Sequence, residues 1–156
     1  MKFASNKELE AKFGKPNITG SGYLVRVKLP YPMKLAWEPQ TRVNYISCHK
    51  MIATSLLAAL SEVLATYGMV RISALNLDVF GGCFNYRKKR NGTTLSSHSW
   101  GIAIDLDPAN NQNSWRSDKA IFARSEYKQF IDIMYKHGFY SYGREIGRDY
   151  MHFEFE

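Results

Sequence analysis

Two short segments in which apolar residues alternate with potential metal ligands constrain the fold of this chain most strongly. They are IAIDLD at residues 102–107 and MHFEF at residues 151–155. A period of two is typical of a strand with one buried and one polar face. The non-core faces therefore carry Ala103, Asp105 and Asp107 in the first segment and His152 and Glu154 in the second.

His98, in the loop before the first of these segments, suggests what the polar faces could do. If the two strands are neighbours in one sheet, His98, one carboxylate and His152 can converge. Two imidazole nitrogens and one carboxylate oxygen, with a fourth position open for water, are a usual catalytic zinc arrangement. Spacing alone leaves open whether Asp105 or Asp107 supplies the oxygen. It also leaves open a structure in which two unrelated strands expose their acids.

The composition limits the class of protein. With 156 residues, 45% hydrophobic and 22% charged, the chain predicts a single globular domain over residues 1–156, which we expect to be a monomer without a membrane span. Cys48 and Cys83 are too few for a disulfide framework and suit a reduced compartment. The start, MKFASNKELEAKFGK, turns charged before an apolar signal region forms, so we expect the protein to be cytoplasmic on synthesis.

The formal net charge of +7 favours an anionic partner, such as nucleic acid, a phosphate-rich surface or a bacterial envelope. The cluster from Arg87 to Arg90 is expected to be a solvated loop. An alternative function is a non-catalytic nucleic-acid- or envelope-binding domain, in which these cations hold an anionic backbone and Phe84 and Tyr86 stack on bases.

The remaining pattern predicts an α+β fold with a small antiparallel sheet and flanking helices. His49, at the start of one predicted helix, and His137, at the end of another, are expected to be structural. Helices are expected at Asn6–Phe13, with a capping box of Ser5 and Glu8, at Cys48–Tyr67, ended by Gly68, and at Ser125–His137, ended by Gly138. Further strands are expected at Tyr23–Leu29 and Leu75–Phe80.

Several motifs resemble the zinc peptidases that cut peptidoglycan stem peptides, namely the D-alanyl-D-alanine carboxypeptidase and dipeptidase family and its phage endolysin-like branch. The family pattern S-x-H-x-x-G-x-A-x-D is matched from Ser96 to Asp105, and D/E-x-x-H is matched by Asp149 and His152. GCFNYR at 82–87 and HGFYSYG at 137–143 are similar to two further family motifs. The resemblance covers about residues 75–156 and implies a hedgehog or DD-peptidase-like fold.

The resemblance implies a role for each matching residue. His98, Asp105 and His152 would bind Zn²⁺, and the family spacing favours Asp105 over Asp107. Asp149 would be the general base, and an aspartate there is closer to the endolysins. Arg87 would support the developing oxyanion, with Arg90 as the second choice.

Four further residues are assigned around this set. Glu154 could be the base, but we favour a role in orienting a ligand from behind. Ser96 is expected to make a local hydrogen bond rather than act as a nucleophile. Trp100 and Tyr86 are candidates to line the substrate cleft, with packing in the core as the equal alternative for each.

The resemblance thus implies a zinc metallopeptidase acting on peptidoglycan peptides, with no nucleic-acid partner. It leaves open a D-Ala-D-Ala carboxypeptidase or an L-Ala-D-Glu endopeptidase. Without an export signal we expect a phage or prophage protein that reaches the wall after phage-type release. A metal-bearing relative without activity is a further alternative.

Overall fold

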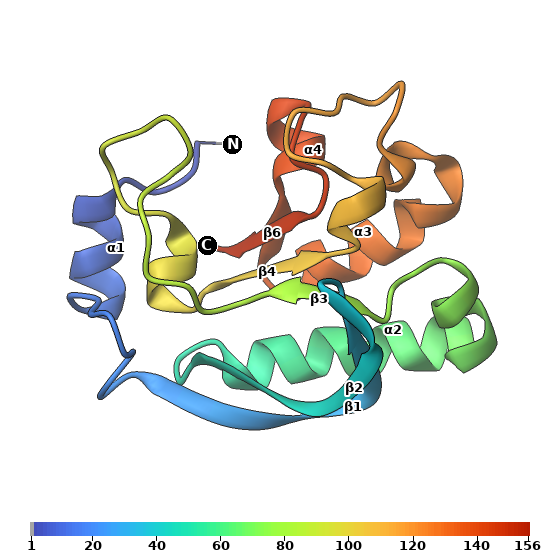
Figure 1. Cartoon of the computed structure of the whole chain (residues 1–156), viewed down its shortest axis with the longest axis horizontal. Helices are drawn as coiled ribbons and strands as arrows, with labels where there is room; N and C mark the ends of the chain where they lie inside the picture. The colour runs from blue at the N-terminus through green and yellow to red at the C-terminus, as the bar shows by residue number, and fades with distance from the viewer. Residues whose placement is uncertain (1) are drawn as a thin grey trace.

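The computed structural model describes residues 2–156, in which helices pack against one six-stranded sheet (Figure 1). The strand order is β2-β1-β3-β4-β6-β5, and every neighbouring pair is antiparallel except β1 with β3. The predicted α+β fold with a largely antiparallel sheet is confirmed. The strands are β1 (Leu24–Leu35), β2 (Glu38–His49), β3 (Val79–Gly82), β4 (Ala103–Leu106), β5 (Phe139–Ser141) and β6 (His152–Phe155). The α-helices are α1 (Asn6–Phe13), α2 (Ala53–Ala74), α3 (Lys128–Lys136) and α4 (Tyr142–Ile146).

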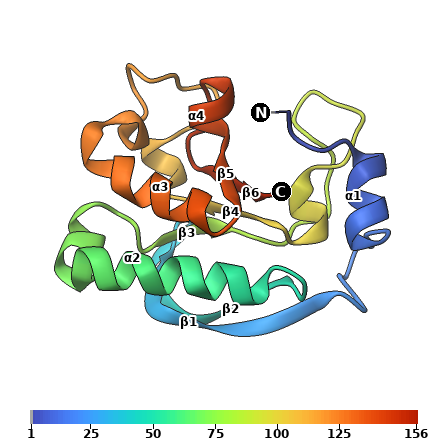
Figure 2. The same cartoon turned by 180° about the vertical axis from the view of Figure 1, so that it is seen from behind.

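Helices α2 and α3 cover one face of the sheet, and Figure 2 shows both in front of it. The inner face of α2 is completely buried, as is Phe130 of α3. By length and composition α2 could cross a membrane, but a core helix passes the same test, and a single such helix carries little weight.

The predicted long helix begins later and ends later than its sequence pattern indicates. Cys48 and His49 pair with Val25 and Leu24 of β1, so they end β2 instead of starting the helix, and Met51 is 55% exposed. Gly68 does break the helical backbone, with φ 73°, but a further turn follows it as far as Ala74. Pairing with a distant strand therefore overrides the local helical pattern.

The first predicted strand also extends further, because β1 continues to Leu35. Pro30 and Pro32 lie where the pairing of β1 with β2 shifts between Lys28 and Met33, as expected for residues that cannot donate to a ladder. The strand predicted at Leu75–Phe80 is correct only in its last two residues. Asn76 has φ 58°, which makes a turn after α2 and delays β3 to Val79.

Candidate metal centre

Strands β4 and β6 are antiparallel neighbours, and Asp105 stands directly opposite His152 in their register. This arrangement fulfils the condition set by the sequence pattern, because the two polar faces are side by side. His98 reaches them from the 3₁₀-helix Ser97–Trp100, which ends at Gly101 with φ 70°. A Cβ at Gly101 would lie 2.8 Å from Leu24 Cδ2, so a glycine is needed for this turn to pack against β1.

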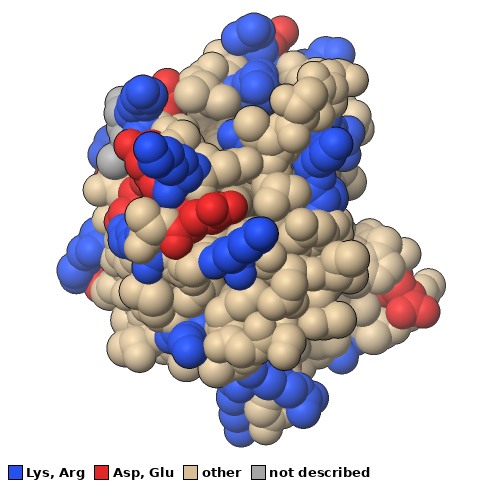
Figure 3. Space-filling model, turned by 90° about the vertical axis from the view of Figure 1, so that its left-hand side faces the viewer, with Lys and Arg blue, Asp and Glu red and all other residues tan. Residues whose placement is uncertain are grey.

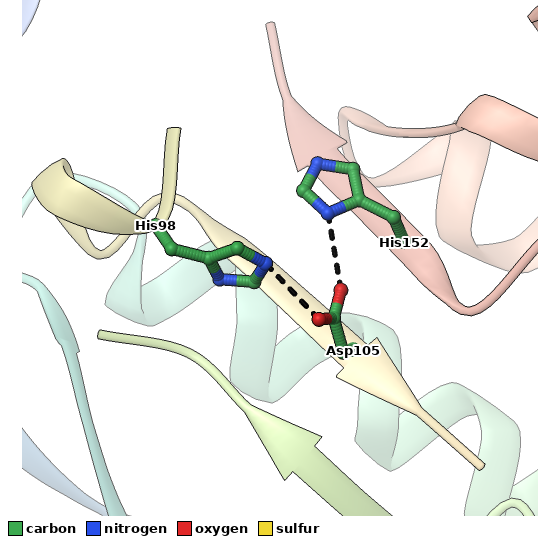
Figure 4. A group of neighbouring side chains, drawn as sticks. All are labelled: His98, Asp105 and His152. Atoms are coloured by element: carbon green, nitrogen blue, oxygen red, sulfur yellow. Dashed lines mark hydrogen bonds and ion pairs between the residues drawn. The ribbon is translucent and has the colours of Figure 1, made fainter. Parts of the chain in front are cut away.

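Three side chains converge, as Figure 4 shows: His98, Asp105 and His152. Their ligand atoms all lie within 4.8 Å of one another. His98 Nε2 is 3.2 Å from Asp105 Oδ2, and His152 Nδ1 is 3.0 Å from Asp105 Oδ1. All three are largely shielded from solvent, so the group forms a compact set of two nitrogens and one carboxylate.

The backbone fixes the tautomer of His98. Its Nδ1 lies 2.8 Å from the carbonyl oxygen of Cys83, which can only accept, so Nδ1 carries the proton. In the neutral ring Nε2 then presents a lone pair. Among residues 2–156 this buried nitrogen has no hydrogen-bond partner, although it faces Asp105 Oδ2. A lone pair facing a carboxylate is repelled by it. Either a proton on Nε2 or a cation held between the two groups relieves that repulsion, and a bound metal ion is such a cation.

His152 is oriented in the same way by a carboxylate behind it. Its Nε2 is 3.0 Å from Glu154 Oε2, and Glu154 is 1% exposed. The Tyr142 hydroxyl donates to the same oxygen at 2.9 Å, and Ser97 Oγ lies 3.3 Å from His152 Nε2. A proton on Nε2 donated to Glu154 leaves Nδ1 free toward Asp105. A carboxylate behind a ligating histidine is a common means of holding it in place.

The charges of these buried groups depend on one another. Burial alone would raise the pKa of Asp105, but His98 and His152 hold that pKa well below its usual value. Burial would lower the pKa of His152, yet hydrogen bonds to Asp105 and Glu154 raise it to about 10. Without a metal, His152 is therefore protonated at neutral pH. Its positive charge then balances the carboxylates of Asp105 and Glu154, as a metal ion would.

Asp149 lies in the turn that leads into β6. Its φ is 56°, its N–H donates to the Asn113 carbonyl at 3.0 Å, and its carbonyl accepts from the N–H of His152 at 3.1 Å. Burial raises the pKa of the Asp149 carboxyl. Asp149 lines the same pocket as the three potential ligands without joining their cluster.

This pocket has a volume of about 510 Å³ and a markedly cationic lining. Beside the three potential ligands and Asp149, it is lined by four cationic side chains: Arg87, Lys89, Arg90 and Arg148. Lys and Arg are also spread over the face of the molecule seen in Figure 3, where acidic side chains are confined to a few places. A concave cationic surface concentrates anionic ligands.

Three sequence-based assignments fare differently. Of its two alternatives, Trp100 takes the packing role and does not line the cleft, because it is fully buried and its Nε1–H donates to the Gly14 carbonyl. Tyr86 is 38% exposed and lies outside the set of described residues that line the pocket. Ser96 makes the expected local bond, accepting from the His98 N–H at 3.3 Å.

Asp107 does not join the cluster. Its φ is 45°, because the chain leaves the strand after Leu106, and alternation therefore no longer applies. Its carboxylate accepts hydrogen bonds from the Asn110 side chain. Of the two aspartates that the pattern left open, Asp105 is the one beside the histidines.

The other two histidines have structural contacts. His49 is buried at the end of β2, not at a helix start, and its Nε2 is 3.1 Å from the Phe13 carbonyl. His137 follows α3, and its Nε2 lies 3.3 Å from Glu62. Both cysteines are free and buried.

Sequence reasoning missed Tyr142, Ser97, Asn113 and Arg148 at this site. Tyr142 lies within the quoted HGFYSYG motif, and Arg148 directly precedes Asp149. The motif around Tyr142 and the position of Arg148 could have pointed to these two residues, but a sequence position does not show which way a side chain points.

Part of the chain matches a known protein family. Residues 89–155 match the family model described as D-alanyl-D-alanine carboxypeptidase. The predicted resemblance to this peptidase family is thereby confirmed, over a segment that contains His98, Asp105, Asp149 and His152. Arg87 lies just outside it. No curated protein matches the chain, and no solved structure matches it.

Proposed function

We propose that this protein is a zinc-dependent peptidase that hydrolyses peptidoglycan stem peptides. The observation that carries the proposal is the buried, unpartnered His98 Nε2 facing Asp105 and His152. The match to a carboxypeptidase family over the same residues supports it. Two imidazoles and one carboxylate are the donor set of catalytic zinc sites, so the residues fit the ion.

When bound by His98, Asp105 and His152, Zn²⁺ would lower the pKa of a coordinated water toward neutrality. Asp149 is our candidate general base, and its place in the pocket and its raised pKa support this role. A carboxyl with a raised pKa can take a proton from the attacking water and return it to the leaving amine. Glu154 is engaged by His152 and Tyr142, which supports an orienting role for it instead.

Arg87 is our candidate for stabilising the oxyanion, with Arg90 as the alternative, because both line the pocket. One such donor is typically worth ~3 kcal/mol, or a rate factor of 100 or more. Together with Lys89 and Arg148, they favour a substrate that carries carboxylates near the scissile bond. Stem peptides, with their D-glutamyl and terminal carboxylates, have that character.

We further propose an endolysin-like protein of phage or prophage origin, made in the cytoplasm, acting on the wall after release and working as a monomer. The aspartate at position 149 supports the endolysin-like branch. The net charge of +7 would help a monomer approach an anionic envelope.

Digestion of purified peptidoglycan by the zinc-loaded protein tests the proposal, with new termini identified by mass spectrometry. New L-Ala carboxyl ends would identify an endopeptidase, and released D-Ala a carboxypeptidase. Equal digestion with and without a chelator would contradict a metal-dependent reaction. No new termini, together with DNA binding that falls steeply with salt and needs no zinc, would favour the binding-domain alternative.

A further inference from the structure

The N-terminal segment lies against the site although it is outside the part of the chain that matches the family. Figures 1 and 2 show α1 beside the loop that precedes β4. Ala4, just before α1, contacts Glu156 at the C-terminus of the chain. The contacts of residues 3–6 go to two different walls of the pocket.

The first wall is the hairpin formed by residues 87–96. It is closed by a hydrogen bond from the Ser96 N–H to the Arg87 carbonyl and by a bridge between Lys88 and Leu95. Its tip is exposed, and it supplies Arg87, Lys89 and Arg90 to the pocket. A hairpin this short needs further support to hold those cations in fixed positions.

Asn6 gives that support. Its Nδ2 donates to the Leu95 carbonyl at 2.9 Å, and its Oδ1 accepts from the Leu95 N–H at 2.7 Å. Both backbone groups of one hairpin residue are thus satisfied by one side chain, as a neighbouring strand would satisfy them. Because Asn6 is the first residue of α1, the capping box of Ser5 and Glu8 fixes its backbone.

The second wall is formed by α4 and β6. The Phe3 ring packs on the Tyr142 ring with centroids 4.2 Å apart, and the Ala4 N–H donates to Glu156 Oε1 at 3.2 Å. Tyr142 is the residue whose hydroxyl donates to Glu154 behind His152. The same four-residue stretch therefore contacts the cationic hairpin on one side and the support of a potential metal ligand on the other.

We propose that residues 3–6 are a brace that joins the two walls and sets the position of the cationic hairpin relative to the metal centre. Asn6 is a positioning residue in this proposal, because it acts through Leu95. The anchoring of α1 to the core is separate: Leu9 and Phe13 are buried, and the Phe13 and Gly14 carbonyls accept from His49 and Trp100. The effect on catalysis rests on the proposed peptidase function.

The test compares Asn6→Ala with Lys7→Ala, a control at the next, exposed position of the same helix. Lys88, Lys89 and Arg90 are trypsin sites within the hairpin, so limited proteolysis followed by mass spectrometry reports its opening. Loss of both hydrogen bonds should raise cleavage there by roughly tenfold or more. Zinc affinity should stay as in the wild type, while KM for stem peptides rises with a smaller change in kcat. Asn6→Asp, which still accepts from Leu95, should fall between Asn6→Ala and the wild type.

Equal cleavage rates and equal KM values in Asn6→Ala and Lys7→Ala would overturn the brace. Loss of zinc affinity in Asn6→Ala would also overturn it, because the segment would then support the metal centre itself. Faster hairpin cleavage in Asn6→Ala, with no peptidase activity even in the wild type, would leave the brace standing and remove the proposed function. The two proposals can therefore fail separately.

Discussion

Replacing Glu154 by glutamine tests how the metal centre is held. The carboxylate is buried, accepts from the Tyr142 hydroxyl and lies 3.0 Å from His152 Nε2. Burial would raise its pKa, but the hydrogen bond from His152 holds that pKa below the usual value, so the group is charged. Glutamine keeps the shape and one acceptor oxygen and removes the charge.

The expected loss follows from the strength of the contact. A hydrogen bond to a charged group contributes about 1.5–3 kcal/mol and a neutral one about 0.5–1.5 kcal/mol. The difference, about 1–1.5 kcal/mol, corresponds to roughly a fivefold to tenfold weaker hold on the His152 ring. Loss of such an orienting partner typically lowers metal affinity by about 10–100-fold. We therefore expect zinc to bind about tenfold more weakly, with 100-fold as the upper bound.

Competition with a chromophoric chelator at neutral pH measures this loss. Glu126→Gln, at an exposed position outside the pocket, is the matched control and should bind zinc as the wild type does. Tyr142→Phe removes one donor from Glu154 and should cost less than Glu154→Gln. Zinc affinity in Glu154→Gln equal to that of the control would refute the orienting role.

Three further predictions concern the proton, the base and the substrate. In the metal-free protein the pKa of His152 is about 10, above its unfolded value of about 6.5. The charged contacts of His152 therefore stabilise the folded state fully below about pH 6.5, and this stabilisation is lost as the pH rises through 10. Zinc binding at pH 7 should accordingly release about one proton, seen in calorimetry as a buffer-dependent enthalpy, and no release would contradict this protonation state. Asp149→Ala should keep its zinc and lose about 10²–10⁴ in kcat on stem peptides, so full activity would remove the proposed base. Arg148→Glu should raise KM more for peptides with free carboxylates than for amidated ones, and an equal rise for both would argue against charge recognition by this side chain.

The strand patterns predicted the most useful part of the site. Alternation placed Asp105 on one polar face and His152 with Glu154 on another, and both placements are found. Alternation works here because a strand with one buried face fixes the side of every residue. It failed at Asp107, where the chain turns out of the strand.

The sequence patterns could not predict contacts between segments that are far apart in the chain. Cys48 and His49 read as helix because their pairing with β1 is not visible locally. The Asn6–Leu95 contact joins residues 89 positions apart. Trp100 stands in a motif beside the site, but its side chain points to the Gly14 carbonyl instead, which no spacing rule reveals.

The central claim is that His98, Asp105 and His152 hold one divalent ion that the protein needs for hydrolysis. Elemental analysis of the purified, zinc-supplemented protein tests it most directly, alongside His98→Ala and the distant control His137→Ala. We expect one zinc per chain in the wild type and in His137→Ala, and a large loss in His98→Ala. A wild type that holds no metal, or a His98→Ala variant that holds as much as the wild type, would contradict the account.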